Sequence, residues 1–296
     1  MAVQAFAPGM YPRSEALVQA TRDLDRGRTT EADVDAQVAA DVQKLIGVQQ
    51  AAGLDLLTDG MLRWQDHFRP LLQAADGLET GALTRYLDTN TFYRAPKATG
   101  TPSLSGPLDE RFSAAVPGPR VATLPSPYAL ARGTDVSPTA MAENVLKPAL
   151  AGVDAELVVL VEPFLAHDGG SPNELREPVE ALSNGAALAL WFPFSDAGPL
   201  LEQGAAELPV EGLGIDFYAT HLDSVPEGLD KLLLAGVVDT RSSVVEDPAE
   251  VAAFAGKLAE RGVERIALVP NGDLQYVSDA VAREKLARLG QARAAA

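Results

Sequence analysis

Acidic side chains end several short apolar runs of this sequence, and they are its clearest candidates for chemistry. These acids and one amide are Asp59, Glu162, Asp216, Asp239, Asn271 and Asp273. A carboxylate can act as a general acid or base, and it can hold the ammonium group of a ligand. Carboxylates that lie together repel each other, so we expect a cation beside them: Arg63, Arg94, Arg241, a metal ion or a ligand ammonium. The alternative is that single acids of this set cap helices or face water.

Three histidines, His67, His167 and His221, also titrate near neutral pH. We expect His67 in a helix after the first apolar run, His167 in a loop, and His221 just past the run that ends in Asp216. His221 could assist a carboxylate as general acid or base, and Arg241 could hold an anion. The alternative for each histidine is a solvated or core side chain, because no neighbour in the sequence fixes its tautomer.

The predicted site combines a catalytic set and a substrate-binding set, each at or near the ends of apolar runs. The catalytic set is Glu162, Asp216, Asp239, His221 and Arg241. The substrate-binding set is Asp59, Ser126, Trp191, Phe194 and Asn271. The chain has no cysteine, so it offers neither a thiolate nucleophile nor a cysteine zinc site, and we predict no metal ligands.

Composition limits the partners of this chain. It has 296 residues, of which 47% are hydrophobic, enough for one large domain or two small ones. The net charge of −17 and a pI near 4.5 repel phosphate backbones and anionic lipid, so we expect a small-molecule ligand and no nucleic acid. No segment has the roughly 20 unbroken apolar residues of a membrane span, and the first residues do not resemble a signal peptide. We therefore expect a cytoplasmic protein away from membranes, with no signal for its oligomeric state.

Helix-start patterns alternate with short apolar runs along the chain. A capping residue followed by proline occurs at Ser137, Ser171 and Asp247, which predicts three helix starts. Two further helices are predicted near the N-terminus, from about residue 14 to 26 and from 30 to 52, and each ends before a glycine. The apolar runs cover residues 54–59, 91–96, 120–127, 156–163, 187–194, 212–219, 232–239 and 265–273. Because these runs are apolar on both faces, they are typical of parallel strands covered by helices on each side.

Eight such strands in a chain of this length predict an α/β fold, a single (β/α)8 barrel, for which roughly 250 residues are typical. We expect a helical lead-in over residues 1–53, the barrel over 54–296, and a long loop over 97–119. A doubly wound open sheet is the alternative. However, Gly212-Leu213-Gly214 opens a strand instead of following one, so it is not a dinucleotide-binding motif. In a barrel the catalytic groups gather at the C-terminal ends of the strands, where the acids stand.

Several segments resemble the C-terminal catalytic barrel of cobalamin-independent methionine synthase, in the form of a single-barrel relative. They are "YPRSEAL" (11–17), "QQAAGLDLLTDGMLRWQDHFRPL" (49–71), "VEPFL" (161–165), "GVVDTRSSVVEDPAEVA" (236–252) and "LVPNGDLQYVSDAVAREKL" (268–286). The resemblance covers essentially the whole chain in matching order. It implies a barrel that transfers a methyl group from a folate to the thiol of homocysteine, which the family holds as a thiolate on zinc.

The residues that the resemblance equates with the zinc ligands are changed in this chain. A His-x-Cys pair, a Glu and a Cys of the family correspond to Trp191 and Pro193, Asp216, and Gly272. Only Asp216 can bind a metal, so we expect no zinc. We expect the sequence "WFPF" (191–194) to form an aromatic wall that either closes the mouth of the barrel or stacks on a flat ligand.

The substrate motifs of the family are changed as well. Its Asp-Gly-Glu reads Asp59-Gly60-Met61 here, its Asp-Glu-Pro reads Val161-Glu162-Pro163, and a proton-donating histidine corresponds to Arg241. Three hypotheses follow. The first is a diverged methyltransferase that acts on a small amine- or thiol-bearing substrate, with a folate-type methyl donor. The second is another reaction on the same barrel, by a lyase or hydrolase, and the third is a catalytically silent protein that binds a ligand or partner.

Overall fold

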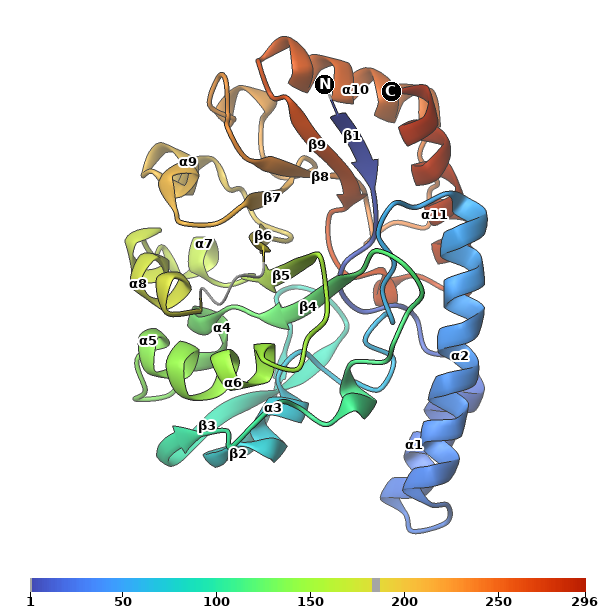
Figure 1. Cartoon of the computed structure of the whole chain (residues 1–296), viewed down its shortest axis with the longest axis vertical. Helices are drawn as coiled ribbons and strands as arrows, with labels where there is room; N and C mark the ends of the chain where they lie inside the picture. Colours follow the sequence, from blue (N-terminus) through green and yellow to red (C-terminus); the bar gives the residue numbers. More distant parts are fainter. Residues whose placement is uncertain (1, 183–186) are drawn as a thin grey trace.

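Seven parallel strands form the central sheet of the computed structural model, which describes residues 2–182 and 187–296 (Figure 1). The strands are β1 (Ala2–Ala5), β4 (Val121–Pro125), β5 (Leu157–Val161), β6 (Ala187–Phe192), β7 (Gly212–Asp216), β8 (Leu232–Val238) and β9 (Arg265–Pro270). Their order across the sheet is β1-β9-β8-β7-β6-β5-β4. Because consecutive strands are neighbours and parallel, the sheet curls in one direction and brings β1 and β4 toward each other.

The segment 54–58 joins these two edge strands. The backbone N–H of Asp55 donates to the carbonyl of Ala5, 2.9 Å away, after β1. On the other side, Leu57 forms a parallel bridge with Arg120 just before β4. The segment therefore takes the eighth position of the ring. The predicted (β/α)8 barrel is confirmed, although this position holds only an isolated bridge instead of the full strand expected over residues 54–59.

Helices cover the outside of the barrel. They are α1 (Glu15–Asp25), α2 (Glu31–Ala52), α3 (Arg69–Ala74), α4 (Pro127–Ala131), α5 (Pro138–Met141), α6 (Lys147–Leu150), α7 (Leu165–Asp168), α8 (Asn173–Leu182), α9 (Gly198–Glu202), α10 (Pro248–Glu260) and α11 (Asp279–Ala295). A π-helical turn, η2 (Ala142–Leu146), joins α5 to α6, and 3₁₀ turns lie at η1 (Glu110–Phe112), η3 (Ala205–Glu207), η4 (Leu222–Ser224) and η5 (Leu274–Tyr276). No helix within the described residues is both long and apolar enough to cross a membrane.

Helix starts follow the predicted caps. The hydroxyl of Ser137 accepts from the backbone N–H of Ala140 at the start of α5, and the carboxylate of Asp247 accepts from that of Ala249 at the start of α10. At the other end of α2, Gly53 has a φ of 71°, a left-handed conformation that suits glycine and ends the helix as predicted. Helices α2 and α11 pack side by side along one flank of the barrel (Figure 1).

Two predictions about the barrel strands are wrong. Residues 91–96 form no barrel strand. They fall in an antiparallel hairpin of β2 (Asp76–Arg85) and β3 (Phe92–Ser103), which lies beside α3, away from the strands of the central sheet (Figure 1). The loop expected from residue 97 consequently starts only after Ser103. The lead-in over residues 1–53 also holds more than helices, because β1 pairs with β9 inside the barrel sheet.

The inside of the barrel is filled by apolar side chains from alternate strand positions. This inner cluster contains five side chains with no exposed surface: Phe6, Val159, Trp191, Leu234 and Val269. A second, larger apolar cluster lies between the strands and the helices. Since Trp191 stands near the C-terminal end of β6, the indole fills the barrel directly below the mouth.

Candidate functional site at the barrel mouth

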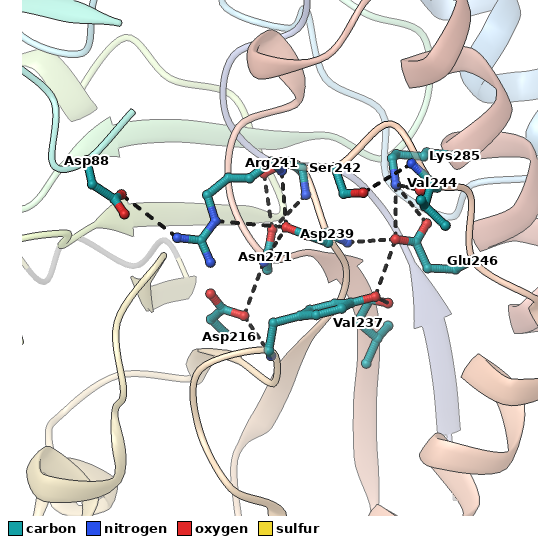
Figure 2. A network of polar contacts seen from close by, with 12 residues as sticks. Asp88, Asp216, Val237, Asp239, Arg241, Ser242, Val244, Glu246, Asn271 and Lys285 are labelled. Atoms are coloured by element: carbon teal, nitrogen blue, oxygen red, sulfur yellow. Dashed lines mark hydrogen bonds and ion pairs between the residues drawn. The ribbon is translucent and has the colours of Figure 1, made fainter. Parts of the chain in front are cut away.

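An acid cluster forms where β7, β8 and β9 end (Figure 2). We use this name for Asp216, Asp239, Arg241 and Asn271. The side-chain amide of Asn271 donates to Asp216 and to Asp239, in each case over 3.2 Å. The side-chain oxygen of Asn271, Oδ1, accepts from the backbone N–H and the hydroxyl of Thr240, at 2.9 and 3.1 Å. These two bonds fix the orientation of the side-chain amide. Asn271 thus bridges two carboxylates that would otherwise repel each other.

Asp216 is the most enclosed acid of the cluster. Its residue is 0% exposed, and its Oδ1 accepts from the backbone N–H of Tyr218 at 2.8 Å. The other oxygen, Oδ2, is buried and has no hydrogen-bond partner within the described residues. Burial raises the pKa of Asp216 to about 6, although hydrogen bonds from Tyr218 and Asn271 oppose that shift. Asp216 can therefore gain or lose a proton near neutral pH.

Arg241 supplies positive charge at the edge of the acid cluster. Its Nε lies 3.9 Å from Asp239, and its guanidinium lies 4.8 Å from the centre of the Phe194 ring. A second contact, also 3.9 Å, reaches Asp88 in the turn of the β2–β3 hairpin (Figure 2). Arg241 therefore joins two of the predicted site residues and links them to the hairpin.

Glu162 and Ser126 form a separate buried pair at the ends of β5 and β4. Ser126 donates its hydroxyl hydrogen to one oxygen of Glu162, and the other oxygen accepts from the backbone N–H groups of Phe164 and Leu165, both at 2.8 Å. Burial raises the pKa of Glu162 to about 7, and the hydrogen bond from Ser126 opposes this shift. Glu162 thus exchanges a proton near neutral pH, but its described hydrogen bonds do not reach the acid cluster.

Asp59 and His221 are two further predicted site residues that lie outside the acid cluster. Asp59 is buried and accepts from the backbone N–H groups of Met61 and Ala114, at 3.0 and 2.9 Å, and it also pairs with Arg120. Its carboxylate therefore anchors the loop before β4. His221 is exposed, with 83% of its side chain accessible, and its nearest acid is Asp223 at 3.6 Å. His167 lies in the short helix α7 and not in a loop.

His67 is a buried partner of Asp273, a pairing that the sequence did not suggest. Its Nε2 lies 2.7 Å from Asp273, and it occupies a bend before α3 instead of the predicted helix. Burial lowers the pKa of His67, but the charge and hydrogen bond of Asp273, together with the charge of Asp66, raise it above its ordinary value. The two residues are 206 positions apart, so no local pattern could have revealed them.

Aromatic rings cover the mouth, and we call them the aromatic roof: Tyr86, Tyr93, Phe164, Phe194 and Tyr276. Tyr86 of the hairpin lies 5.9 Å from Phe164, which follows β5, and 6.4 Å from Tyr276, which follows β9. The rings of Phe194 and Tyr276 meet edge to face at 5.4 Å. Because β5 and β9 are on opposite sides of the ring of eight positions, the roof spans the mouth. The sequence analysis missed Tyr86, Tyr93 and Tyr276. An Asp-Thr-Asn turn between two tyrosines was a local signal for the first two, and Tyr276 had none.

Trp191 has no exposed surface, and its indole N–H has no partner within the described residues. Of the two roles predicted for the "WFPF" segment, this position agrees with closing the barrel and leaves no indole face open for stacking on a ligand. Phe194, with a φ of 59°, adopts a left-handed conformation that turns its ring toward Tyr276 and Arg241. The segment therefore fills the end of the barrel with Trp191, and its last residue, Phe194, belongs to the roof above.

The residues that the resemblance equates with the family's zinc ligands do not fit a zinc ion. Trp191, Pro193 and Gly272 have no side-chain donor for a metal, and only Asp216 offers oxygen. Across the described parts of the chain, no group of three or more His, Cys, Asp or Glu side chains is placed to hold a metal ion. The chemistry of the acid cluster is therefore discussed below in terms of its own protein groups.

In sequence, this chain is similar to a methionine-synthase-type methyltransferase. The chain is 30% identical to the 5-methyltetrahydropteroyltriglutamate–homocysteine methyltransferase of Caulobacter vibrioides, over an alignment of 268 residues that covers 75% of this chain. It spans about a third (33%) of that relative's length. No family model matches the chain.

Solved structures share the fold at low sequence identity. A B12-independent methionine synthase from Shewanella sp. W3-18-1, solved with selenomethionine, superposes with a TM-score of 0.75 at 14% identity and covers 99% of this chain and 96% of its own. A putative B12-independent methionine synthase from Listeria monocytogenes gives 0.75 at 16%, covering 99% and 98%. A methyltransferase from Methanosarcina mazei gives 0.57 at 14%, covering 98% and 94%. In sequence and in fold, the chain therefore resembles the cobalamin-independent methionine synthases, as its motifs predicted.

Proposed function

We propose that this protein is a diverged methyltransferase of the methionine-synthase type, which acts on a small amine- or thiol-bearing substrate without a zinc ion. A folate-type compound is the methyl donor that we expect. The similarity to a homocysteine methyltransferase supports the reaction class. The residues at the zinc positions support a route that does not use the metal, because only one of them can donate to it.

One observation carries the proposal: Asp216 has a buried carboxylate oxygen without a partner among the described residues, beside a second carboxylate, at the end of a barrel strand. With a pKa near 6, Asp216 can take the N–H or S–H proton of an acceptor as the acceptor's nitrogen or sulfur bonds to the methyl carbon. The bond between that carbon and the donor nitrogen breaks, and the donor nitrogen takes a proton from water. Asp239 would hold an ammonium group of the substrate, and Arg241 would hold its carboxylate.

Calorimetric titration with homocysteine and with 5-methyltetrahydrofolate tests this function. We expect binding of at least one of them, and the Asp216→Asn variant should weaken it about tenfold, as the loss of a charge-assisted contact of about 1.4 kcal/mol predicts. Asp135→Asn, a change of an exposed acid, is the matched control and should bind as the wild type does. Prior treatment with a chelator should leave the affinity unchanged. No detectable binding of either compound, or binding that is lost after treatment with the chelator, would contradict the proposal.

A catalytically silent, ligand-binding protein is the second candidate, and the aromatic roof favours it. Tyr86 is buried, Tyr276 is half-buried, and Trp191 fills the barrel below the mouth, so a substrate must displace packed rings to reach the acid cluster. This candidate predicts that a compound bound in the calorimetric assay is not converted. Mass spectrometry of the incubated mixture separates the two, since a mass increase of about 14 Da on the acceptor requires methyl transfer.

A further inference from the structure

A cavity of about 600 Å³ opens between the loops that follow β7 and β8 and the first turns of α10, beside the barrel mouth. We call it the rim pocket. Its volume falls in the range of about 300–1,000 Å³ that is common for small-molecule sites. It shares Asp239 with the acid cluster, but neither Asp216, Asn271 nor any residue of the aromatic roof lines it. The rim pocket is therefore a separate place where a ligand can bind.

Aromatic side chains form the apolar part of the rim pocket. Phe217, after β7, and Phe254, from α10, meet edge to face with ring centres 4.9 Å apart. Tyr218 lies next to them and is 52% exposed, while Val244 is 72% exposed. Four large apolar side chains are more than half exposed in the described part of the chain, and two of them line this one pocket. Exposed apolar surface gathered around a hollow is typical of a binding site.

Carboxylates form its polar part. Asp239, Glu246, Asp247 and Glu250 line the rim pocket, and none of the described lining residues is lysine or arginine. Glu246 is neutralised from behind by Lys285, whose ammonium lies 3.0 Å from both carboxylate oxygens and whose side chain is 0% exposed (Figure 2). Asp247 accepts a hydrogen bond from the backbone N–H of Ala249 at the start of α10, so its charge lies at the positive end of that helix. Asp239 is only loosely paired, with Arg241 at 3.9 Å, and Glu250 is exposed, so these two carboxylates can face a ligand.

We propose that the rim pocket binds a small organic cation, an ammonium group on an aromatic or branched apolar body. The apolar body packs on Phe217, Tyr218 and Phe254, whose ring faces also attract a cation. The ammonium group lies toward Asp239 and Glu250, where no described lining residue competes for it with a positive charge. An anion is disfavoured by the same carboxylates. This binding does not depend on methyl transfer at the acid cluster.

Titration calorimetry with benzyltrimethylammonium, at low ionic strength and neutral pH, tests this inference. Its neutral and anionic counterparts, neopentylbenzene and 3-phenylpropionate, test the requirement for positive charge. We expect the cation to bind at millimolar concentration or below and at least about tenfold more tightly than either counterpart, and added salt should weaken it. Equal binding of the neutral compound, tighter binding of the anion, or no binding of the cation at millimolar concentration would overturn the proposal.

Two variants locate the bound cation. Tyr218→Leu keeps apolar bulk but removes the ring, and Glu250→Gln removes an exposed charge without changing shape. Each variant should bind the cation about threefold to tenfold more weakly, as losses of roughly 0.7–1.4 kcal/mol in binding free energy predict. Phe92→Leu is the matched control, because Phe92 is also 52% exposed but lies on the hairpin. If the cation binds and neither variant weakens it, the cation is bound elsewhere and the rim pocket is not its site.

Discussion

Glu162 is an acid whose burial favours the protonated form, although the hydrogen-bond donors around it favour the carboxylate. Ser126 and the backbone N–H groups of Phe164 and Leu165 surround its two oxygens. Burial raises the pKa from 4.5 to about 7, so between these pH values the folded protein keeps a proton that the unfolded chain has released. The contribution of Glu162 to stability is therefore complete below about pH 4.5 and is lost as the pH rises toward 7.

The Glu162→Gln variant should remove this pH dependence, because glutamine resembles the protonated acid at every pH. Relative to wild type, the free energy of unfolding of the variant should rise by roughly 3 kcal/mol between the two pH values, at about 1.4 kcal/mol per pKa unit. Urea unfolding at a series of pH values measures the difference. Glu250→Gln, at an exposed position, should keep the wild-type slope. A Glu162→Gln variant with that same slope would show that Glu162 ionises at its ordinary pKa.

Trp191 gives a second prediction at the scale of single residues. It is paired with Gly214 of β7, where an added Cβ would overlap the indole ring. Gly214→Ala should therefore cost about 2 kcal/mol of unfolding free energy, as overpacking in a dense core does. In a Trp191→Leu background the same change should cost less than half as much.

Denaturant melts of the four proteins give the coupling energy between positions 191 and 214. Gly256→Ala is the control, because a Cβ there meets no atom within 4 Å and α10 should gain up to about 1 kcal/mol. Equal costs of Gly214→Ala in both backgrounds would mean that the indole does not fill this space.

Site residues could be predicted from the sequence where one strand end defines them. Asp216, Asp239 and Asn271 each end a strand, and the barrel brings these ends together. The pairing of His67 with Asp273 could not be predicted, because the fold brings together two residues that are far apart in the sequence. The sequence also did not reveal that Trp191 is fully buried, because a strand end can point its side chains inward or outward.

At the scale of elements, the prediction succeeded for the two N-terminal helices and for the strands from β4 to β9, and it failed for the first strand and the hairpin. The two N-terminal helices and six of the strands lie where hydrophobic patterns and caps placed them. Strand β1 has only four residues, "AVQA", too few to show a pattern. The hairpin strand β3 begins with the aromatic residues Phe92 and Tyr93, which have the composition of a barrel strand, and only its partner β2 shows that it is antiparallel.

Helix α11 is tied to the loop between β8 and α10 by one buried ion pair. Lys285 bonds both oxygens of Glu246 and the carbonyl of Val244, and Glu246 also accepts from the backbone N–H of Asp239 at 2.8 Å. Lys285→Met should cost at least about 3 kcal/mol, because it leaves a carboxylate enclosed without its cation. The double variant with Glu246→Met should recover part of this loss.

Thermal and urea unfolding of the single and double variants test the pair. Lys97→Met breaks an ion pair of the hairpin, Lys97 with Glu79, in which both side chains are more than half exposed. This control should change stability by no more than about 0.5 kcal/mol. A Lys285→Met variant that behaves like the control would show that the pair does not hold α11 to the loop.

At the scale of the whole molecule, the barrel is closed by two short elements, strand β1 and the segment 54–58. Strand β1 pairs with β9 on one side, and the segment 54–58 bridges β1 to β4 on the other. Directly after β1, Phe6 points into the barrel and is 0% exposed. The side chain of Phe6 thus joins the closing strand to the inner core on which the strands of the opposite side also pack.

Phe6→Ala should consequently destabilise the whole barrel by about 3–5 kcal/mol, the loss expected when a buried phenylalanine leaves a cavity. Because the cavity adjoins the closing strand, hydrogen exchange should rise in β9 and β4, which flank the closure, as well as in β1. Phe92→Ala, at a half-exposed position of the hairpin, should change stability by less than about 1 kcal/mol. Faster exchange confined to β1, with β4 and β9 protected as in the wild type, would mean that the barrel stays closed without its first strand.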